Sequence, residues 1–173
     1  LNSPNNPSGQ ICENLEEIAS IAEKYNLIIL SDEIYSELSF INNYQSISNF
    51  CPEKTIISTG LSKWCGAGGW RLGYFLVPDS LTEIKNMINV LASETFSAVS
   101  APIQYAAIKA YEQDHSNYIN KSKNILGAIG NYVYENLRSN KVLINKPQGG
   151  FYLMPEFLNK KFNSSSEMCD SIL

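Results

Sequence analysis

The sequence has little that would bind a metal ion or form a disulfide framework. Its 173 residues include one histidine, His115, and four cysteines, and no two cysteines have a C-x-x-C or zinc-site spacing. We therefore predict reduced thiols and no metal ion. The chain does not open with a charged and then apolar leader, so we expect a cytoplasmic protein.

Features of membrane and nucleic-acid binding are also missing. No apolar run approaches the roughly 18 residues that suggest a membrane-spanning helix. The 13 Lys and Arg residues are outnumbered by 17 Asp and Glu residues, the formal net charge is -4, and no basic cluster stands out. A nucleic-acid-binding domain normally carries a basic patch. The sequence therefore predicts neither a nucleic-acid partner nor a membrane partner.

The composition is that of a globular protein. Hydrophobic residues make up 44% of the chain and charged residues 17%, which is too apolar and too weakly charged for a disordered chain. A length of 173 residues suits one domain, or one domain and part of another. A chain of this size buries a substantial core.

The pattern of apolar residues predicts an α/β fold. A helix is expected from residues 14–17, which have the sequence of a helix N-terminus, and short apolar runs at 27–30, 55–58 and 71–77 predict strands. The first run is wholly apolar, which is typical of a strand buried on both faces of a parallel sheet. We therefore expect the first half of the chain to form a mostly parallel sheet flanked by helices.

The rest of the chain predicts helices followed by two short strands. A capping box at 80–83 begins the first helical region. The further helices are expected at 103–112 and 117–137, and the strands at 142–144 and 151–154. This order is typical of a smaller α+β unit.

Both ends of the sequence are expected to be cut ends. Residues 3–9 form a dense turn signal almost at the start of the chain. Near the other end, Ser164 and Glu167 have the spacing of a capping box, which predicts a helix although the chain stops at Leu173. We therefore expect this sequence to be a fragment of a longer protein.

Four polar residues lie where a ligand binds in an open α/β sheet, beyond the carboxyl ends of the strands. Asp32 and Tyr35 follow the first predicted strand, Lys63 follows the second, and Asn6 lies in the opening turn. Singly, each has an ordinary explanation, because an aspartate after a strand is usually a turn or cap residue and a loop lysine is usually solvated. Their combination is what points to a site.

Four motifs occur in a fixed order along the chain. They are Ser-Pro-Asn-Asn-Pro-Ser-Gly (3–9), Ser-Asp-Glu-Ile-Tyr (31–35), Ser-Lys (62–63) and Gly-Gly-Trp-Arg-Leu-Gly-Tyr (68–74). With them, the sequence resembles the class I/II aminotransferases, the aspartate aminotransferase family of fold-type-I pyridoxal phosphate enzymes. The turn Pro-Gln-Gly-Gly-Phe-Tyr at 147–152 is similar as well. The resemblance implies part of the large cofactor-binding domain at 1–115 and the beginning of the small domain at 116–173.

The resemblance gives two residues the central chemical roles. Lys63 matches the catalytic lysine, which forms a Schiff base with pyridoxal phosphate. Asp32 matches the carboxylate that pairs with the pyridine nitrogen of the cofactor. This pairing keeps the nitrogen protonated, so that the ring accepts the electrons left when the substrate Cα–H bond breaks.

The remaining candidates match groups that bind the cofactor. Tyr35 and Asn6 match the residues that hydrogen-bond its phenolic oxygen, and Ser62 and Arg71 match ligands of its phosphate. Many members of the family have a serine three residues before the catalytic lysine, where this chain has Gly60. We therefore expect either that one hydroxyl contact to the phosphate is lost or that Thr59 partly replaces it.

The implied activity is the transfer of an amino group between an amino acid and a 2-oxo acid, in a homodimer. Two alternatives remain open: a pyridoxal phosphate-dependent lyase of the C–S β-lyase or cyclopropane-forming type, and a non-catalytic cofactor-binding sensor domain of a transcription regulator. In the family, the phosphate loop, the ring-stacking aromatic residue and the carboxylate-binding arginine lie outside the matching segment. The chain alone is therefore expected to have little or no activity.

Overall fold

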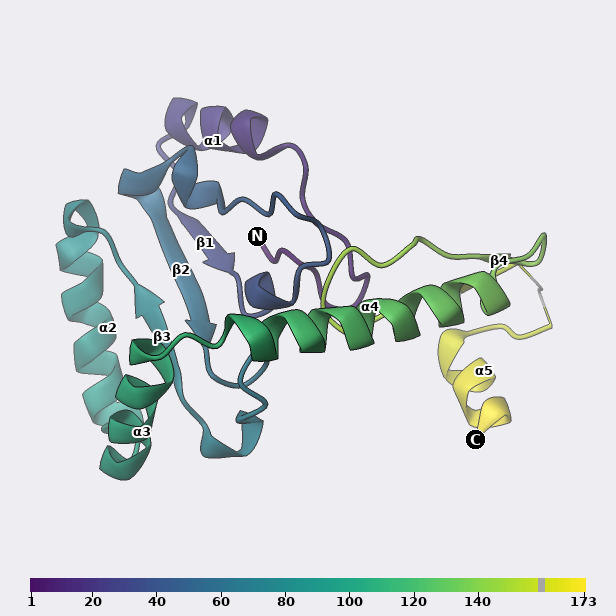
Figure 1. The fold of residues 1–173 in the computed structure, drawn as a ribbon. Helices are drawn as coiled ribbons and strands as arrows, with labels where there is room; N and C mark the ends of the chain where they lie inside the picture. Colours follow the sequence, from purple (N-terminus) through teal and green to yellow (C-terminus); the bar gives the residue numbers. More distant parts are fainter. Residues whose placement is uncertain (159–160) are drawn as a thin grey trace.

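A three-stranded sheet organises the larger part of the molecule. The computed structural model describes residues 1–158 and 161–173, and its sheet is ordered β1 (Ile29–Asp32), β2 (Thr55–Gly60) and β3 (Gly73–Leu76) (Figure 1). β1 and β2 are parallel, whereas β2 and β3 are antiparallel. The helices and this mixed sheet form the expected α/β arrangement.

β3 is the antiparallel strand of a sheet that is predicted to be mostly parallel. Parallel neighbours need a crossover of about a dozen or more residues, usually a helix. The described residues 61–72 instead form a loop whose regular structure is the short 3-10 helix Gly68–Trp70. Because no helix carries the chain back across the sheet, β3 returns along β2 in the opposite direction.

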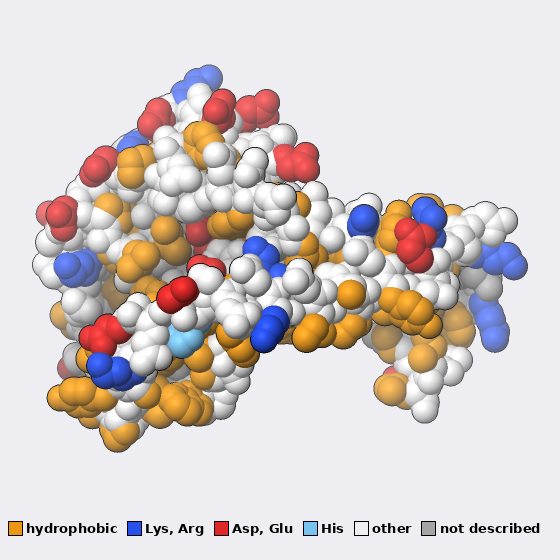
Figure 2. Space-filling view, viewed as in Figure 1, with side chains coloured by type: hydrophobic (Ala, Val, Ile, Leu, Met, Phe, Trp, Pro, Cys, Tyr) orange, Lys and Arg blue, Asp and Glu red, His pale blue; other side chains and the backbone are white. Residues whose placement is uncertain are grey.

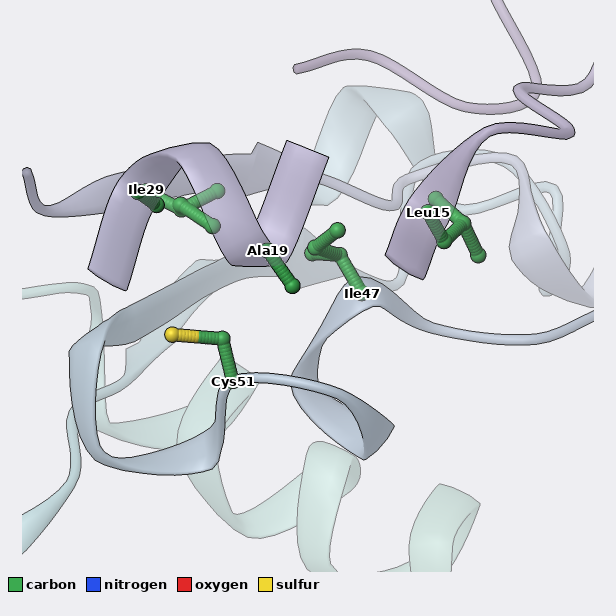
Figure 3. Packing of buried hydrophobic residues seen from close by; sticks show 6 residues of the cluster. Leu15, Ala19, Ile29, Ile47 and Cys51 are labelled. Carbon is green, nitrogen blue, oxygen red and sulfur yellow. The ribbon is translucent and has the colours of Figure 1, made fainter. Parts of the chain in front are cut away.

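One face of β1 is buried and the other is exposed. Ile29 packs under helix α1 (Leu15–Lys24), whereas Leu30, on the opposite face, is 53% exposed. The prediction of a strand buried on both faces is therefore wrong for this chain, and the strand also begins and ends two residues later than expected. The cluster beneath α1 joins the helix to the sheet (Figure 3); it is formed by Leu15, Ala19, Ala22, Ile29, Ile47 and Cys51.

Two of the predicted helix caps are wrong. Asn14 precedes α1 but makes no side-chain capping hydrogen bond. Ser80 lies inside the 3-10 helix Asp79–Leu81, where its hydroxyl donates to the carbonyl oxygen of Glu53. Helix α2 (Thr82–Thr95) begins after this turn, so Ser80 is not at its N-cap position.

Helix α3 (Ala101–Glu112) holds the loop that follows β2. Pro102 lies in the first turn of α3, where its missing N–H group is tolerated. The loop side chains pack on this helix through a second buried cluster, which consists of Leu61, Trp64, Ala67, Leu72 and Ala107. This packing fixes the backbone on both sides of residue 63.

Helix α4 (Ser116–Leu137) runs away from the sheet toward a smaller unit (Figure 1). There β4 (Val142–Leu143) and β5 (Glu156–Phe157) form a two-stranded antiparallel sheet, followed by α5 (Ser165–Ile172). The strand predicted at 151–154 is absent, and pairing occurs further along, at β5. The division of the chain into domains at residues 115 and 116 stays a prediction.

The predicted cap of α5 is confirmed. Ser164 Oγ accepts a hydrogen bond of 3.1 Å from the backbone N–H of Glu167. Among the helices described, none combines the length and apolar character needed to cross a membrane. Within the same residues, no group of three or more His, Cys, Asp or Glu side chains is placed to hold a metal ion.

Candidate functional site

The candidate site lies at the edge where β1 and β2 end. Asp32, the last residue of β1, is paired with Ser58 of β2, and the N–H of Glu33 donates to the Ser58 carbonyl oxygen at 2.9 Å. The carboxyl ends of parallel strands are where ligands bind in sheets of this kind. This register brings Asp32 and Tyr35 to the same edge as the loop that carries Lys63.

The opening turn is attached to the end of β1. Asn2 forms a parallel bridge with Asp32, and its side-chain N–H donates to the Asp32 carbonyl oxygen at 3.1 Å. The N–H of Ser3 donates to the same oxygen at 3.2 Å. Asn2 Oδ1 in turn accepts a hydrogen bond from the backbone N–H of Asn6 at 2.7 Å. These contacts bring Asn6 to the edge where Asp32 ends its strand.

A turn from the far end of the chain, residues 147–152, closes over this edge. The N–H groups of Gln148 and Gly149 both donate to the carbonyl oxygen of Gly9, at 2.8 and 3.1 Å, and the N–H of Gly150 donates to the Leu38 carbonyl oxygen at 3.1 Å. The turn is thus held on one side by the opening turn and on the other by the segment that follows Tyr35.

Gly9 is required at this contact for two reasons. Its φ is +68°, a left-handed conformation that residues with a side chain rarely adopt. A Cβ atom there would also lie 2.6 Å from the carbonyl oxygen of Tyr152. The glycine that ends the 3–9 motif therefore lets the opening turn approach the 147–152 turn closely.

Tyr35 is buried between these two turns. Its side chain is 4% exposed, and its ring contacts the edges of Phe151 and Tyr152 with centroid distances of 5.5 and 5.6 Å. Its hydroxyl oxygen lies 3.0 Å from that of Tyr152, and either group can donate. Burial, followed by the contact with Tyr152, raises the pKa of Tyr35 well above its ordinary value of 10.0, although a hydrogen bond with Asn6 opposes the rise. Tyr35 is therefore a neutral phenol that can donate one proton.

Lys63 extends toward the same aromatic group. Its Nζ atom lies 5.5 Å from the ring centroid of Tyr35 and 5.3 Å from that of Phe151, which are cation–π distances. The neighbouring Trp64 is buried, so the loop backbone is fixed while the half-buried lysine faces the rings. Within the described part of the chain, no acceptor forms a hydrogen bond with Lys63 Nζ. The amine is therefore positioned without being occupied by an ion pair.

Asp32 offers a carboxylate oxygen at the same edge. The side chain is half-buried, and Oδ1 accepts a hydrogen bond of 3.2 Å from the backbone N–H of Ile34. Among the residues that the structure describes, none donates to Oδ2. One oxygen therefore orients the carboxylate, and the other is available to a ligand.

Ser62 and Arg71 are less closely joined to this group. Ser62 adjoins Lys63 and is half-buried, whereas the exposed Arg71 donates from Nη1 to the carbonyl oxygen of Gly68, within its own loop. Arg71 has a φ of +57°, which is uncommon for a residue with a side chain. No contact in the described residues joins either side chain to Asp32 or Tyr35.

The sequence interpretation did not assign Phe151 and Tyr152 to the site. Their turn was noticed only as a motif, but the structure places both aromatic rings against Tyr35, and Phe151 beside Lys63. The signal that was available is the motif itself: glycines followed directly by two aromatic residues indicate a backbone that approaches another segment closely.

Comparison with known proteins gives one consistent family. The family model described as aminotransferase class I and II matches residues 1–173. The aspartate aminotransferase of Thermotoga maritima is 34% identical over 157 residues, which cover 88% of this chain and 40% of that protein. The aromatic-amino-acid aminotransferase 2 of Thermococcus litoralis is 33% identical over 173 residues, or 95% of this chain and 43% of that protein. The chain thus spans less than half the length of these relatives.

Solved structures are similar over the same extent. An alanine aminotransferase from Pyrococcus furiosus superimposes with a TM-score of 0.86 at 32% identity, covering 97% of this chain and 44% of that one. The aspartate aminotransferase of Thermus thermophilus with maleate gives a TM-score of 0.82 at 25% identity, covering 90% and 41%. These likenesses confirm the predicted α/β fold, as part of the fold of those enzymes.

Proposed function

The chain belongs to the class I and II aminotransferase family, and from this premise we propose that the protein transfers an amino group between an amino acid and a 2-oxo acid. The catalytic residue in this proposal is Lys63, and the cofactor is pyridoxal phosphate. The observation that carries the proposal is the placement of the Lys63 amine beside the rings of Tyr35 and Phe151, at the strand edge that ends in Asp32.

The groups present at this edge fit the cofactor. Asp32 has an oxygen that no described residue occupies, which suits the protonated pyridine nitrogen. Tyr35 and Asn6 offer neutral donors for the phenolic oxygen. Ser62 and Arg71 are suitable ligands for a phosphate, Arg71 through a charge-assisted hydrogen bond. In the structure Arg71 donates within its own loop, so binding phosphate requires that this side chain turn.

When bound, pyridoxal phosphate supplies a reactive aldehyde and a ring that accepts electrons. The protein residues orient it and move protons. Asp32 holds the proton on the ring nitrogen, because its charge favours the protonated form. The Lys63 amine takes the proton from the substrate Cα as a general base and, as a general acid, delivers it to the C4′ carbon of the cofactor. Tyr35, which burial keeps neutral, donates its proton as a hydrogen bond to the phenolic oxygen.

The identity of the substrate side chain stays open in this proposal. The relatives act, by their names, on aspartate and on aromatic amino acids, and a structural relative acts on alanine. These names differ in charge and size while the matching segment is shared. The residues that we assign to the site act on the cofactor and on the Cα proton, which do not differ between these substrates.

Borohydride reduction tests the proposal directly. The protein made from its complete reading frame is incubated with pyridoxal phosphate, reduced, and mapped by peptide mass spectrometry, together with Lys63→Ala and the control Lys85→Ala on the exposed surface of α2. We expect one pyridoxyl adduct, at Lys63, which is lost in Lys63→Ala and kept in Lys85→Ala. Labelling scattered over many lysines and unchanged in Lys63→Ala would contradict the assignment.

Product analysis then distinguishes the reaction. With amino-acid and oxo-acid pairs, we expect a new amino acid to form in step with a new oxo acid, and Lys63→Ala to lower the rate by about a thousandfold or more. Release of ammonia or a thiol without a new amino acid would instead identify a lyase. An adduct at Lys63 without any turnover would favour a sensor domain.

We further propose that the active protein is a cytoplasmic homodimer. Apolar side chains gather over α3 and along the lower face of α4 (Figure 2). The exposed apolar residues of these helices include Tyr105 and Ile108 on α3 and Ile125 and Ile129 on α4, which are between 49% and 73% exposed. Large apolar patches of this kind mark surfaces that contact other segments or subunits. Light scattering on the protein from the complete reading frame tests the dimer.

A further inference from the structure

We propose that Tyr152 is a positioning residue for Tyr35: its hydroxyl donates to the Tyr35 oxygen and so directs the Tyr35 proton into the cofactor site. This inference rests on the proposed function. It adds a role for a residue of the smaller unit, which reaches the site across 117 positions of sequence.

The two hydroxyl groups form a close pair. Their oxygens are 3.0 Å apart, and the rings meet edge to face with an interplanar angle of 86°. Tyr35 is 4% exposed, so water has little access to its hydroxyl group. Tyr152, together with Asn6, therefore supplies the hydrogen bonds that solvent supplies to an exposed tyrosine.

The direction of this hydrogen bond decides what Tyr35 can do. A phenol has one proton to donate and accepts through its lone pairs. Without a ligand the hydrogen bond with Tyr152 raises the pKa of Tyr35, which is the effect of Tyr35 acting as the donor, and its proton is then turned away from the site. An anionic ligand oxygen beside Tyr35 favours the reverse arrangement, in which Tyr152 donates and Tyr35 keeps its proton for the ligand. Hydrogen bonds in such a chain strengthen one another, so Tyr152 also makes Tyr35 a better donor.

The backbone around Tyr152 holds it in this position. Gly150 has a φ of +72°, its N–H donates to the Leu38 carbonyl oxygen at 3.1 Å, and a Cβ at this glycine would lie 3.6 Å from Tyr35 Cδ1. The turn backbone is therefore packed against the Tyr35 ring itself. The position of the Tyr152 hydroxyl group beside that of Tyr35 is therefore fixed by the backbone of the turn as well as by the Tyr152 side chain.

A double-mutant cycle with the protein from the complete reading frame tests the inference. The variants are Tyr152→Phe, Tyr35→Phe and the double variant, with Tyr132→Phe, which is 71% exposed on α4, as the matched control. Two readouts are taken: the dissociation constant of pyridoxal phosphate, and the pH at which the absorption band of the bound cofactor changes. Each phenylalanine keeps the ring and removes one oxygen atom, and thermal unfolding checks that the fold is retained.

We expect Tyr152→Phe to weaken cofactor binding about two- to tenfold, the range of one neutral hydrogen bond. It should also raise the pH midpoint of the absorption band by up to about one unit, because a weaker donor at Tyr35 stabilises the deprotonated cofactor less. In the Tyr35→Phe background, Tyr152→Phe should change neither value further, and Tyr132→Phe should match the wild type.

Three outcomes separate the possibilities. If the wild type binds the cofactor and Tyr152→Phe leaves both values unchanged, the inference is overturned and the proposed function stands. If the two single effects simply add in the double variant, Tyr152 acts independently of Tyr35 and the inference is also overturned. If the wild type itself binds no pyridoxal phosphate, the proposed function fails, and the inference that rests on it fails with it.

Discussion

Lys63 Nζ lies 5.3 Å from the ring centroid of Phe151, although the lysine follows a strand of the main sheet and the phenylalanine follows α4. The segment that carries Phe151 is not in a regular element at this point. It is held by backbone hydrogen bonds to Gly9 and Leu38. The 147–152 turn thus contacts the opening turn at Gly9 and the segment after Tyr35 at Leu38, and it places Phe151 beside Lys63. The surroundings of the lysine therefore depend on segments that are far apart in the sequence.

Replacing Asp32 with asparagine should abolish most of the activity while keeping the fold. The asparagine oxygen can still accept the hydrogen bond from the N–H of Ile34, but the negative charge that holds a proton on the cofactor nitrogen is lost. We expect the transamination rate of the protein from the complete reading frame to fall about a hundredfold or more. Asp79→Asn, at an exposed position before α2, is the matched control. A loss no greater than in Asp79→Asn would refute the role of Asp32.

Glu33 is a buried carboxylate that accepts hydrogen bonds from two serine hydroxyl groups. It is 6% exposed, and its Oε1 accepts hydrogen bonds from Ser31 Oγ at 2.9 Å and Ser46 Oγ at 2.6 Å. Glu33→Gln keeps the shape but removes the charge that strengthens both bonds. We expect the free energy of unfolding to fall by about 2 kcal/mol, measured by urea denaturation. The exposed control Glu53→Gln should change it by less than about 0.5 kcal/mol, and equal losses in the two variants would rule out a special role for Glu33.

How far the site was predictable depends on how local its signals are. Asp32, Tyr35 and Lys63 follow the ends of two predicted strands, and ligands bind beyond such ends in an open sheet. The parallel register of β1 and β2 then brings the three residues to one edge. These positions were therefore predictable before the geometry was known, whereas their roles toward a cofactor stay predictions.

What the sequence did not predict depends on long-range contacts. Tyr152 meets Tyr35 because the 147–152 turn is hydrogen-bonded to distant segments, and no local pattern reports this. Ser80 has the local sequence of a helix cap, yet it lies inside the 3-10 helix Asp79–Leu81 and donates to the Glu53 carbonyl oxygen.

Gly60 marks a close approach of two strands and should not tolerate a side chain. A Cβ atom there would lie 2.5 Å from the carbonyl oxygen of Leu72 and 2.8 Å from the Cα of Gly73, and neither backbone group can move freely. We expect Gly60→Ala to lower the free energy of unfolding by about 1–3 kcal/mol. A Cβ at Gly69 would meet nothing within 4 Å, so Gly69→Ala is the matched control.

The comparison also tests whether this close approach accounts for the glycine that stands where many family members have a serine before the lysine. If Gly60→Ala and Gly69→Ala were equally stable in urea denaturation, the close approach at β2 would not be what requires glycine. A larger loss in Gly60→Ala, without a change in the Gly69→Ala midpoint, would show that the backbone of β3 occupies the space in which a side chain would lie.

The protein should lose stability at alkaline pH because of three tyrosines. Burial is the largest cause that raises the pKa of Tyr35, Tyr44 and Tyr74 above the ordinary value of 10.0. Above about pH 10 the unfolded chain releases these protons while the folded chain keeps them. The folded state then binds more protons than the unfolded state, so the free energy of unfolding falls as the pH rises.

Urea denaturation at a series of pH values above neutrality measures this effect. The stabilising contribution should be complete below about pH 10 and decrease beyond it. Replacing Tyr74 with phenylalanine removes one of the three phenols and should flatten the alkaline decrease, whereas Tyr132→Phe, at an exposed position, should leave its slope unchanged. An alkaline slope that is the same in both variants would mean that Tyr74 ionises alike in the folded and unfolded chains, and that its burial does not control its proton.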